Sequence, residues 1–148
     1  MEVRELGHIV LYVRDMELSR RFYGEVLGWR EMVRYGELGV VFSSGRTHHE
    51  LLLLEVGPDA APVPPGRRLG LYHFGLKIGE TDEDLRRALQ ELAEAGIQVM
   101  GSADHTITHS VYILDPDGNE IELYIDVQPE VWREDPTVIL ARPRPLRL

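Results

Sequence analysis

Hydrophobic and polar residues alternate along several short stretches of the chain, and turn signals separate these stretches. Residues 7–13 alternate in a β-branched pattern that predicts a strand. Asp15 then begins a segment whose apolar residues recur at helical spacing until Gly28. Three further apolar stretches follow, at residues 30–35, 38–44 and 48–56. The first half of the chain is therefore predicted to fold as strand, helix and three strands.

The same order of elements begins again at residue 71. Residues 71–78 predict a strand, Thr81 is the expected N-cap of a helix, and Gly96 is expected to end that helix. Three more strands are expected at residues 97–101, 110–115 and 120–126, with DPDG as the turn between the last two. The repetition indicates two similar modules in one chain.

Proline and glycine mark the connection between the modules. We place module 1 at residues 1–56, a linker at 57–70, module 2 at 71–127 and a C-terminal extension at 128–148. A chain of 148 residues suits one domain with a shared core. The predicted fold class is therefore α+β, a single domain (1–148) built from two tandem βαβββ modules.

The repeat relates candidate ligands in the two modules. His8 and His73 stand 65 residues apart, each at the start of its module's first strand. In the last strand, Glu120, Glu122 and Tyr124 share one face because strand side chains alternate. These residues are candidates for one shared site.

The fourth strand of module 1 can be aligned with the last strand of module 2 through their preceding glycines. His49 stands four positions after Gly45, as Glu122 stands four positions after Gly118. This alignment predicts that His49 lies on the face that matches the face of Glu122.

Composition narrows the classes of function. The chain has no cysteine, so a metal would have to be held by histidine and carboxylate. The net charge of −9 argues against nucleic acid as a partner. No apolar run is long enough to span a bilayer, and charged residues near the N-terminus interrupt any signal-peptide pattern, so we expect a cytoplasmic protein.

The stretches GHIVLYV, YHFGLKI and DPDGNEIELY, in this order of elements, resemble the vicinal oxygen chelate superfamily. Glyoxalases, bleomycin-resistance proteins and extradiol ring-cleaving dioxygenases belong to it. The resemblance implies that the modules form a curved mixed sheet around a central metal cleft. It also implies that His8, His73 and Glu122 hold Fe(II), with Mn, Ni or Zn as alternatives.

Two further stretches resemble the extradiol dioxygenase branch in particular. HHELLLLEV is similar to the strand that carries a catalytic acid/base, which would be His49, with His48 as its outward neighbour. DHTITHSVYILDPDGN is similar to the segment in which a histidine and a tyrosine line the substrate pocket. The resemblance thus implies a catalytic role for Tyr112 and substrate contact for His105, while His109 is either a second pocket residue or structural.

All six histidines fall in these segments, which favours a metal site over isolated surface histidines. The resemblance implies an Fe(II)-dependent extradiol-type dioxygenase with a small aromatic substrate and O2 as reactants. A glyoxalase-type isomerase or lyase is the first alternative, and a non-enzymatic antibiotic-binding protein is the second. Members of the superfamily commonly dimerise, so we expect a homodimer or a higher even oligomer.

Overall fold

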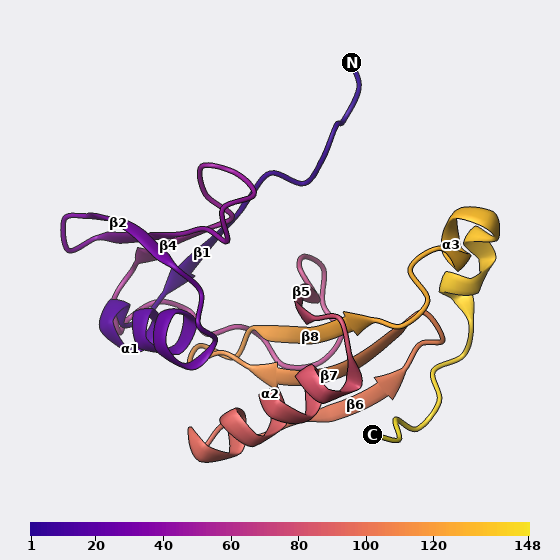
Figure 1. Ribbon diagram of the computed structural model, residues 1–148. Helices are drawn as coiled ribbons and strands as arrows, with labels where there is room; N and C mark the ends of the chain where they lie inside the picture. Colours follow the sequence, from indigo (N-terminus) through magenta and orange to yellow (C-terminus); the bar gives the residue numbers. More distant parts are fainter. The chain divides into compact units, whose positions relative to one another are not determined.

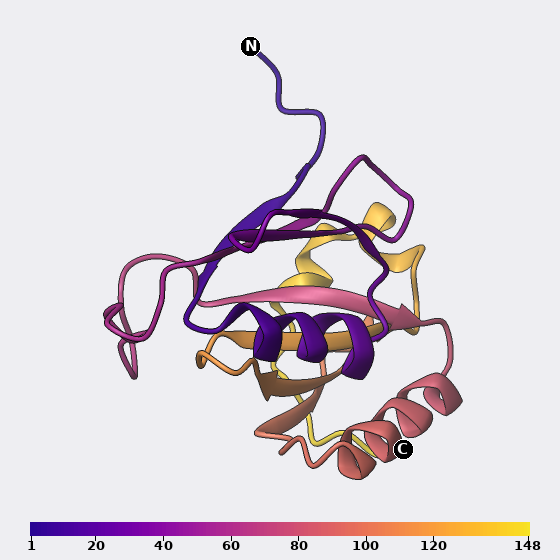
Figure 2. The ribbon, with the colours of Figure 1, turned by 90° about the vertical axis from the view of Figure 1, so that its left-hand side faces the viewer.

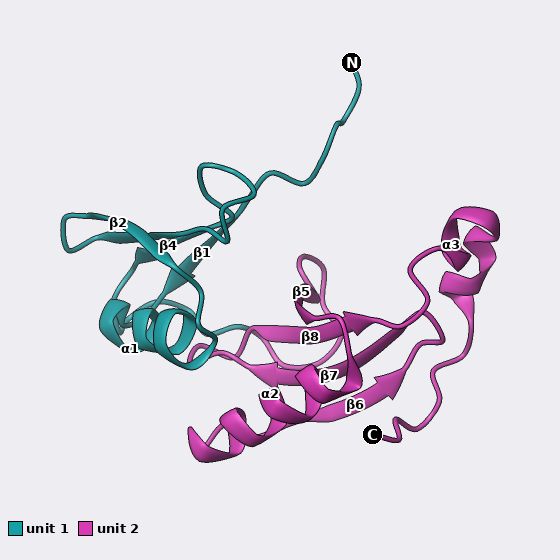
Figure 3. Cartoon of the chain, viewed as in Figure 1, with its two compact units in different colours: residues 1–63 teal, residues 64–148 magenta.

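The computed structural model describes residues 1–148, which form two compact units, residues 1–63 and 64–148 (Figure 3). Each unit contains one four-stranded mixed sheet and a helix (Figure 1). The predicted α+β fold with two βαβββ modules is therefore confirmed. None of the helices combines the length and the apolar character that crossing a membrane requires.

The sheet of unit 1 has the order β1-β4-β3-β2, with β1 parallel to β4 and the other pairs antiparallel. Its elements are β1 (Ile9–Val13), α1 (Met16–Arg21), the π-helix η1 (Phe22–Val26), β2 (Glu31–Tyr35), β3 (Gly39–Phe42) and β4 (Leu51–Glu55). Asp15 is the N-cap of α1, as predicted, and its Oδ1 accepts a hydrogen bond from the Leu18 amide at 2.8 Å. The helix α1 packs beside the sheet of unit 1 (Figure 2). On the sheet face that it covers, Phe42, Leu51 and Leu53 are fully buried.

The sheet of unit 2 has the matching order β5-β8-β7-β6, with β5 parallel to β8. Its elements are β5 (His73–Gly79), α2 (Asp82–Glu94), β6 (Gly101–Asp104), β7 (Thr108–Leu114), β8 (Glu120–Asp126), α3 (Val131–Glu134) and the 3₁₀ helix η2 (Pro136–Leu140). Thr81 caps α2 through a capping box with Asp84, and Gly96 follows the helix end with φ of +72°. Both helix boundaries agree with the prediction.

The two faces of β8 differ in burial as strand alternation predicts. Ile121, Leu123 and Ile125 are at most 2% exposed, on the face that α2 covers with Leu85 and Leu92. Glu120, Glu122 and Tyr124 lie on the opposite, partly exposed face. The apolar side of β8 therefore supports the core, and its carboxylates face the space opposite the helix.

One predicted strand is displaced. The strand expected at residues 97–101 forms instead as β6 at Gly101–Asp104. The Ile97 amide donates to the Leu92 carbonyl at 2.8 Å and so completes the C-terminus of α2. This bond keeps Ile97, the first residue of the predicted strand, at the end of α2. The strand that pairs with β7 therefore begins only at Gly101.

The turn between β7 and β8 fixes the register of β8 by local contacts. Asp115 Oδ1 accepts hydrogen bonds from the amides of Asp117 at 2.9 Å and Asn119 at 2.8 Å. Gly118 has φ of +88°, in the left-handed region that side chains with a Cβ atom avoid. The DPDG sequence thus sets which residues of β8 face away from α2.

Replacing Gly118 with alanine is expected to destabilise the protein by about 1–2 kcal/mol, because alanine at this φ is strained. Gly118→Asn should cost less, since asparagine tolerates this conformation better. Urea unfolding of both variants would measure the difference. Equal stability of the alanine and wild-type proteins would contradict the argument.

Candidate functional site

A pocket of about 450 Å³ opens on the face of the unit 2 sheet that carries Glu122. It is lined by His73, His105, Ile107, Thr108, Tyr112, Glu122, Tyr124, Asp126, Trp132 and Ile139. Four of the residues predicted from the sequence, His73, His105, Tyr112 and Glu122, are therefore brought together within one unit. Tyrosine, tryptophan and isoleucine side chains supply the apolar part of the wall.

His73 and Glu122 form the polar centre of this pocket. His73 Nε2 lies 3.4 Å from Glu122 Oε2, and both side chains are largely shielded from solvent. His73 Nδ1 is buried without a hydrogen-bond partner, although Glu120 Oε1 is 3.4 Å away. The pair places an imidazole nitrogen and a carboxylate oxygen side by side, which is the arrangement expected of two ligands of one metal ion.

Tyr112 and His105 extend this polar centre. The Tyr112 hydroxyl donates to Glu122 Oε1 at 3.3 Å and lies 2.8 Å from His105 Nε2. Burial, with the negative charge of Glu122 as a second cause, raises the pKa of Tyr112 to about 12. The phenol therefore stays protonated near neutral pH and can donate a hydrogen bond.

His109 lies elsewhere. Thr108 and Tyr112 of β7 line the pocket, and His109 lies on the opposite face of the strand because side chains alternate. His109 is therefore not a lining residue. Its Nδ1 is 2.6 Å from Oδ1 of Asp82 at the start of α2. Of the two interpretations left open by the sequence, this contact favours the structural one.

Unit 1 contains a second group of histidines at the start of β1 and β4. The ring centroids of His8 and His49 are 4.2 Å apart, and those of His48 and His49 are 4.4 Å apart. The Nδ1 atoms of His48 and His49 are in contact, and His48 is the more exposed of the two. Burial, followed by the nearby His8 and His48, lowers the pKa of His49.

The alignment of His49 with Glu122 is wrong. Val10 of β1 pairs with Leu52, and Gly75, at the corresponding place in β5, pairs with Glu122. Leu52 is therefore the residue of unit 1 that corresponds to Glu122.

The cause of this error is the length of one loop. The connection between β3 and β4, residues 43–50, is longer than the turn between β7 and β8, residues 115–119. Counting from the glycine of each turn therefore shifts the register, and His49 lies just before β4 instead of within it.

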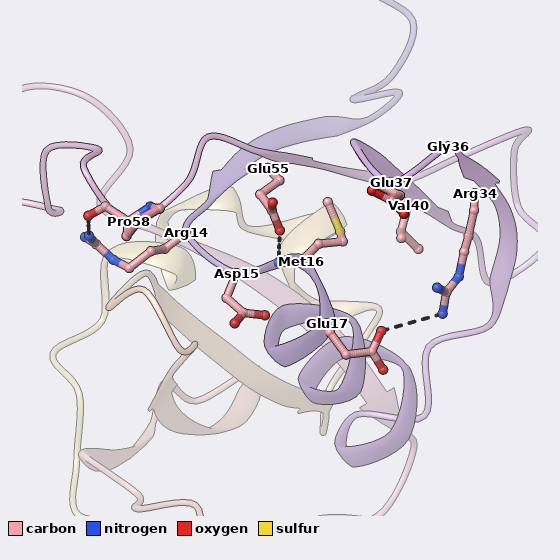
Figure 4. Close-up of a pocket in the computed structure, with 10 residues that line it drawn as sticks. All are labelled: Arg14, Asp15, Met16, Glu17, Arg34, Gly36, Glu37, Val40, Glu55 and Pro58. Atoms are coloured by element: carbon pink, nitrogen blue, oxygen red, sulfur yellow. Dashed lines mark hydrogen bonds and ion pairs between the residues drawn. The ribbon is translucent and has the colours of Figure 1, made fainter.

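Unit 1 also has a cavity of about 590 Å³ near the start of α1 (Figure 4). Its charged groups hold neighbouring segments together. Glu55 Oε2 accepts from the Met16 amide at 2.7 Å, Arg14 donates to the Pro58 carbonyl at 2.5 Å, and Arg34 lies 3.8 Å from Glu17. None of the predicted site residues lines this cavity. We therefore assign its charges a structural role.

The residues of the unit 2 pocket suit a metal ion chemically. A Cβ atom on Gly75 would lie 3.2 Å from the Tyr124 ring and 3.6 Å from Glu122 Oε2, so the glycine leaves space beside the carboxylate. His73 Nδ1 has no hydrogen-bond partner, and its Nε2 faces the Glu122 carboxylate, so internal hydrogen bonds do not use up the ligand atoms of this imidazole. Neither unit by itself assembles three or more histidine or carboxylate side chains as a metal site. The role of His8, in unit 1, as the third ligand stays a prediction.

Several lining residues were not predicted from the sequence. Tyr124 shares strand parity with Glu122, so alternation could have identified it. Trp132 and Ile139 lie in the C-terminal extension, where the sequence has no strand or helix periodicity that would place them at the pocket.

The fold and the pocket define the class of this protein: two βαβββ modules in one chain, with polar residues gathered in a pocket on one face of the second sheet. The model of the Glyoxalase/Bleomycin resistance protein/Dioxygenase superfamily matches residues 5–123. The chain belongs to this superfamily, and the resemblance to the vicinal oxygen chelate proteins is confirmed.

The relatives with known names include dioxygenases and thiol transferases. The chain is 34% identical to catechol-2,3-dioxygenase of Bacillus subtilis (strain 168) over 90% of its length and 46% of that protein. It is 32% identical to biphenyl-2,3-diol 1,2-dioxygenase 2 of Rhodococcus globerulus, over 82% of its length and 63% of that protein. The chain thus spans between about half and two thirds of these relatives.

A solved structure supports the fold. The crystal structure of a glyoxalase/dioxygenase from Nostoc punctiforme superposes with a TM-score of 0.69 at 28% identity, covering 83% of this chain and 91% of that one.

Distant relatives of the chain, as the sequence comparisons show, are enzymes, mostly dioxygenases.

Proposed function

We propose that the chain is an Fe(II)-dependent extradiol-type dioxygenase that cleaves the ring of a small catecholic substrate. The observation that carries the proposal is the convergence of His73, His105, Tyr112 and Glu122 in one aromatic-lined pocket. Similarity to catechol-2,3-dioxygenase supports it, although the chain spans 46% of that protein.

His73 Nε2 and Glu122 Oε2 would hold the iron, with His8 as the third ligand that the sequence predicts. Bound with two histidines and one carboxylate, Fe(II) would keep open positions for a catecholate and O2. Glu120, 3.4 Å from His73 Nδ1, would orient the imidazole from its other side.

Tyr112 would bind a substrate oxygen. Its pKa of about 12 keeps the hydroxyl protonated, so its one proton could turn from Glu122 to a substrate oxygen that has lost its own proton. His105 Nε2, 2.8 Å from that hydroxyl, would fix the direction in which the proton points. His49 would accept the proton of the second substrate hydroxyl, the role that the resemblance assigns to it.

The isomerase alternative is less well supported. A glyoxalase-type site calls for a fourth protein ligand on the strand of module 1 that corresponds to β8. The residue at the position of Glu122 is Leu52, which has no ligand atom. The register of β4 therefore favours a site with three protein ligands.

The test is metal loading followed by turnover. Protein produced with iron under anaerobic conditions should bind about one Fe(II) per chain and, after addition of catechol and air, give the yellow absorbance of a ring-fission product with uptake of O2. Absence of product across a broad catechol panel, together with turnover of a glutathione hemithioacetal by the nickel or zinc form, would contradict the proposal. The expected homodimer is tested separately by light scattering.

A further inference from the structure

The C-terminal extension contributes to the wall of the pocket. After β8 the chain forms α3 and η2, and each helix supplies one lining residue, Trp132 and Ile139. These two apolar side chains are 43% and 60% exposed. The apolar surface that they leave uncovered therefore borders the same space as His73 and Glu122.

Trp132 is restrained within this segment. The guanidinium of Arg133 lies 5.1 Å from the centroid of its ring, a distance at which a cation–π interaction is favourable. Arg133 itself forms an ion pair with Glu130. The indole thus has a cationic neighbour within its own helix.

The extension is tied down beyond η2. Arg144 forms an antiparallel bridge with Asp104 of β6, with both amide-to-carbonyl distances at 2.9 Å. The Arg144 guanidinium also lies 3.0 Å from Asp104 Oδ2. β8 and this bridge therefore anchor the two ends of the segment that carries Trp132 and Ile139.

Asp104, which holds Arg144, belongs to the β6–β7 hairpin that also carries His105. Asp104 Oδ1 accepts from the Thr106 amide at 2.7 Å, and Thr106 has φ of +76°, an unusual value for a β-branched residue. The His105 amide donates to the Thr108 carbonyl at 2.9 Å, so this turn sets where His105 points. Asp104 therefore links the position of the extension to a residue that contacts Tyr112.

The charges of the pocket restrict which ligand groups can bind beside the apolar side chains Trp132 and Ile139. Its acidic lining residues are Glu122 and Asp126, and no arginine or lysine lines it. Lys77 pairs with Asp126 at 2.9 Å but is not a lining residue. With the iron bound to the two catechol hydroxyls, a carboxylate elsewhere on the ligand would meet acidic oxygens and no arginine or lysine, whereas a neutral apolar group would meet Trp132 and Ile139.

We propose that residues 131–144 form a substrate-selecting wall, in which Trp132 and Ile139 bind the ring and its substituent and the Asp104–Arg144 bridge holds the wall in place. The preferred ligands are catechols with a neutral apolar substituent. This inference rests on the proposed function, because it takes the two hydroxyls to be bound near His73 and Glu122.

The test measures ligand binding separately from turnover. Iron-loaded protein under anaerobic conditions is titrated with 4-tert-butylcatechol and with 3,4-dihydroxybenzoate. Trp29 and Trp132 are the two tryptophans, so fluorescence in a Trp29→Phe background reports on Trp132. The neutral catechol is expected to bind at least about tenfold more tightly than the carboxylate, because only the latter brings an unpaired charge.

Variants in the extension then test the wall. Ile139→Ala is expected to weaken binding of 4-tert-butylcatechol about five- to twentyfold through lost apolar contact. Arg144→Gln should weaken it in the same direction, with recovery in Arg144→Lys. Leu140→Ala is the matched control, since Leu140 belongs to the same helix, is 84% exposed and does not line the pocket.

The outcomes separate the two proposals. Equal effects of Ile139→Ala and Leu140→Ala, or tighter binding of the carboxylate, would overturn the selecting wall even if air yields ring-fission product. Selective binding that depends on Ile139, with no product after air is admitted, would support the wall and contradict the dioxygenase activity.

Discussion

Replacing Glu122 with glutamine is expected to lower iron affinity by at least about a hundredfold and to abolish ring cleavage. Changes to groups that merely support metal ligands typically cost ten- to a hundredfold, and loss of a ligand's charge should exceed that. The amide keeps the shape of the side chain but removes the anion that lies 3.4 Å from His73 Nε2. Iron content after gel filtration and product absorbance after addition of catechol and air would measure the two effects.

Glu91→Gln is the matched control for this variant. Glu91 lies on the exposed side of α2 in the same unit, and the substitution removes the same charge. It should leave iron content and turnover unchanged. Retention of iron by the Glu122→Gln protein, with circular dichroism like that of the wild type, would remove Glu122 from the metal site.

That Glu122 shares one face of β8 with Glu120 and Tyr124 could be predicted, because short-range interactions determine it. Asp115 and Gly118 close a turn whose geometry depends on four consecutive residues. The apolar residues Ile121 and Leu123 then determine which face of β8 packs against α2. Once that face is fixed, alternation places Glu122 on the other one. The same kind of local information gave the N-caps Asp15 and Thr81 correctly.

The placement of His49 and of the extension could not be predicted, for a different reason. His49 depends on how residues 43–50 return to β4, and Ser43 Oγ, which donates to the Thr47 carbonyl at 2.6 Å, makes a contact within that loop that no periodic pattern marks. Trp132 and Ile139 belong to a segment whose far end is held by a bridge between Asp104 and Arg144, two residues far apart in sequence. Such long-range pairings follow from tertiary packing, which hydrophobic periodicity does not encode.

Gly79 at the end of β5 gives the largest expected effect on stability. A Cβ atom there would lie 2.4 Å from Asp84 Cβ and 2.8 Å from Asp84 Oδ2. Asp84 cannot easily move, because its Oδ2 accepts hydrogen bonds from the amides of Glu80 and Thr81, both at 3.0 Å, within the capping box of α2. The methyl group therefore has to displace either the strand or the helix cap.

Gly79→Ala is accordingly expected to destabilise the protein by about 2–4 kcal/mol, the sum of an overpacked contact and a weakened cap. Gly101→Ala is the control, because Gly101 is also a strand glycine of unit 2 but its Cβ would meet its nearest neighbour, Tyr112 Cδ2, at 3.9 Å. That substitution should change stability by less than about 1 kcal/mol, since alanine there mainly restricts the unfolded chain. Urea unfolding would show a lower midpoint with an unchanged slope for Gly79→Ala alone. If both alanine variants unfold at the same midpoint, α2 is not held against β5 through the contact between Gly79 and Asp84.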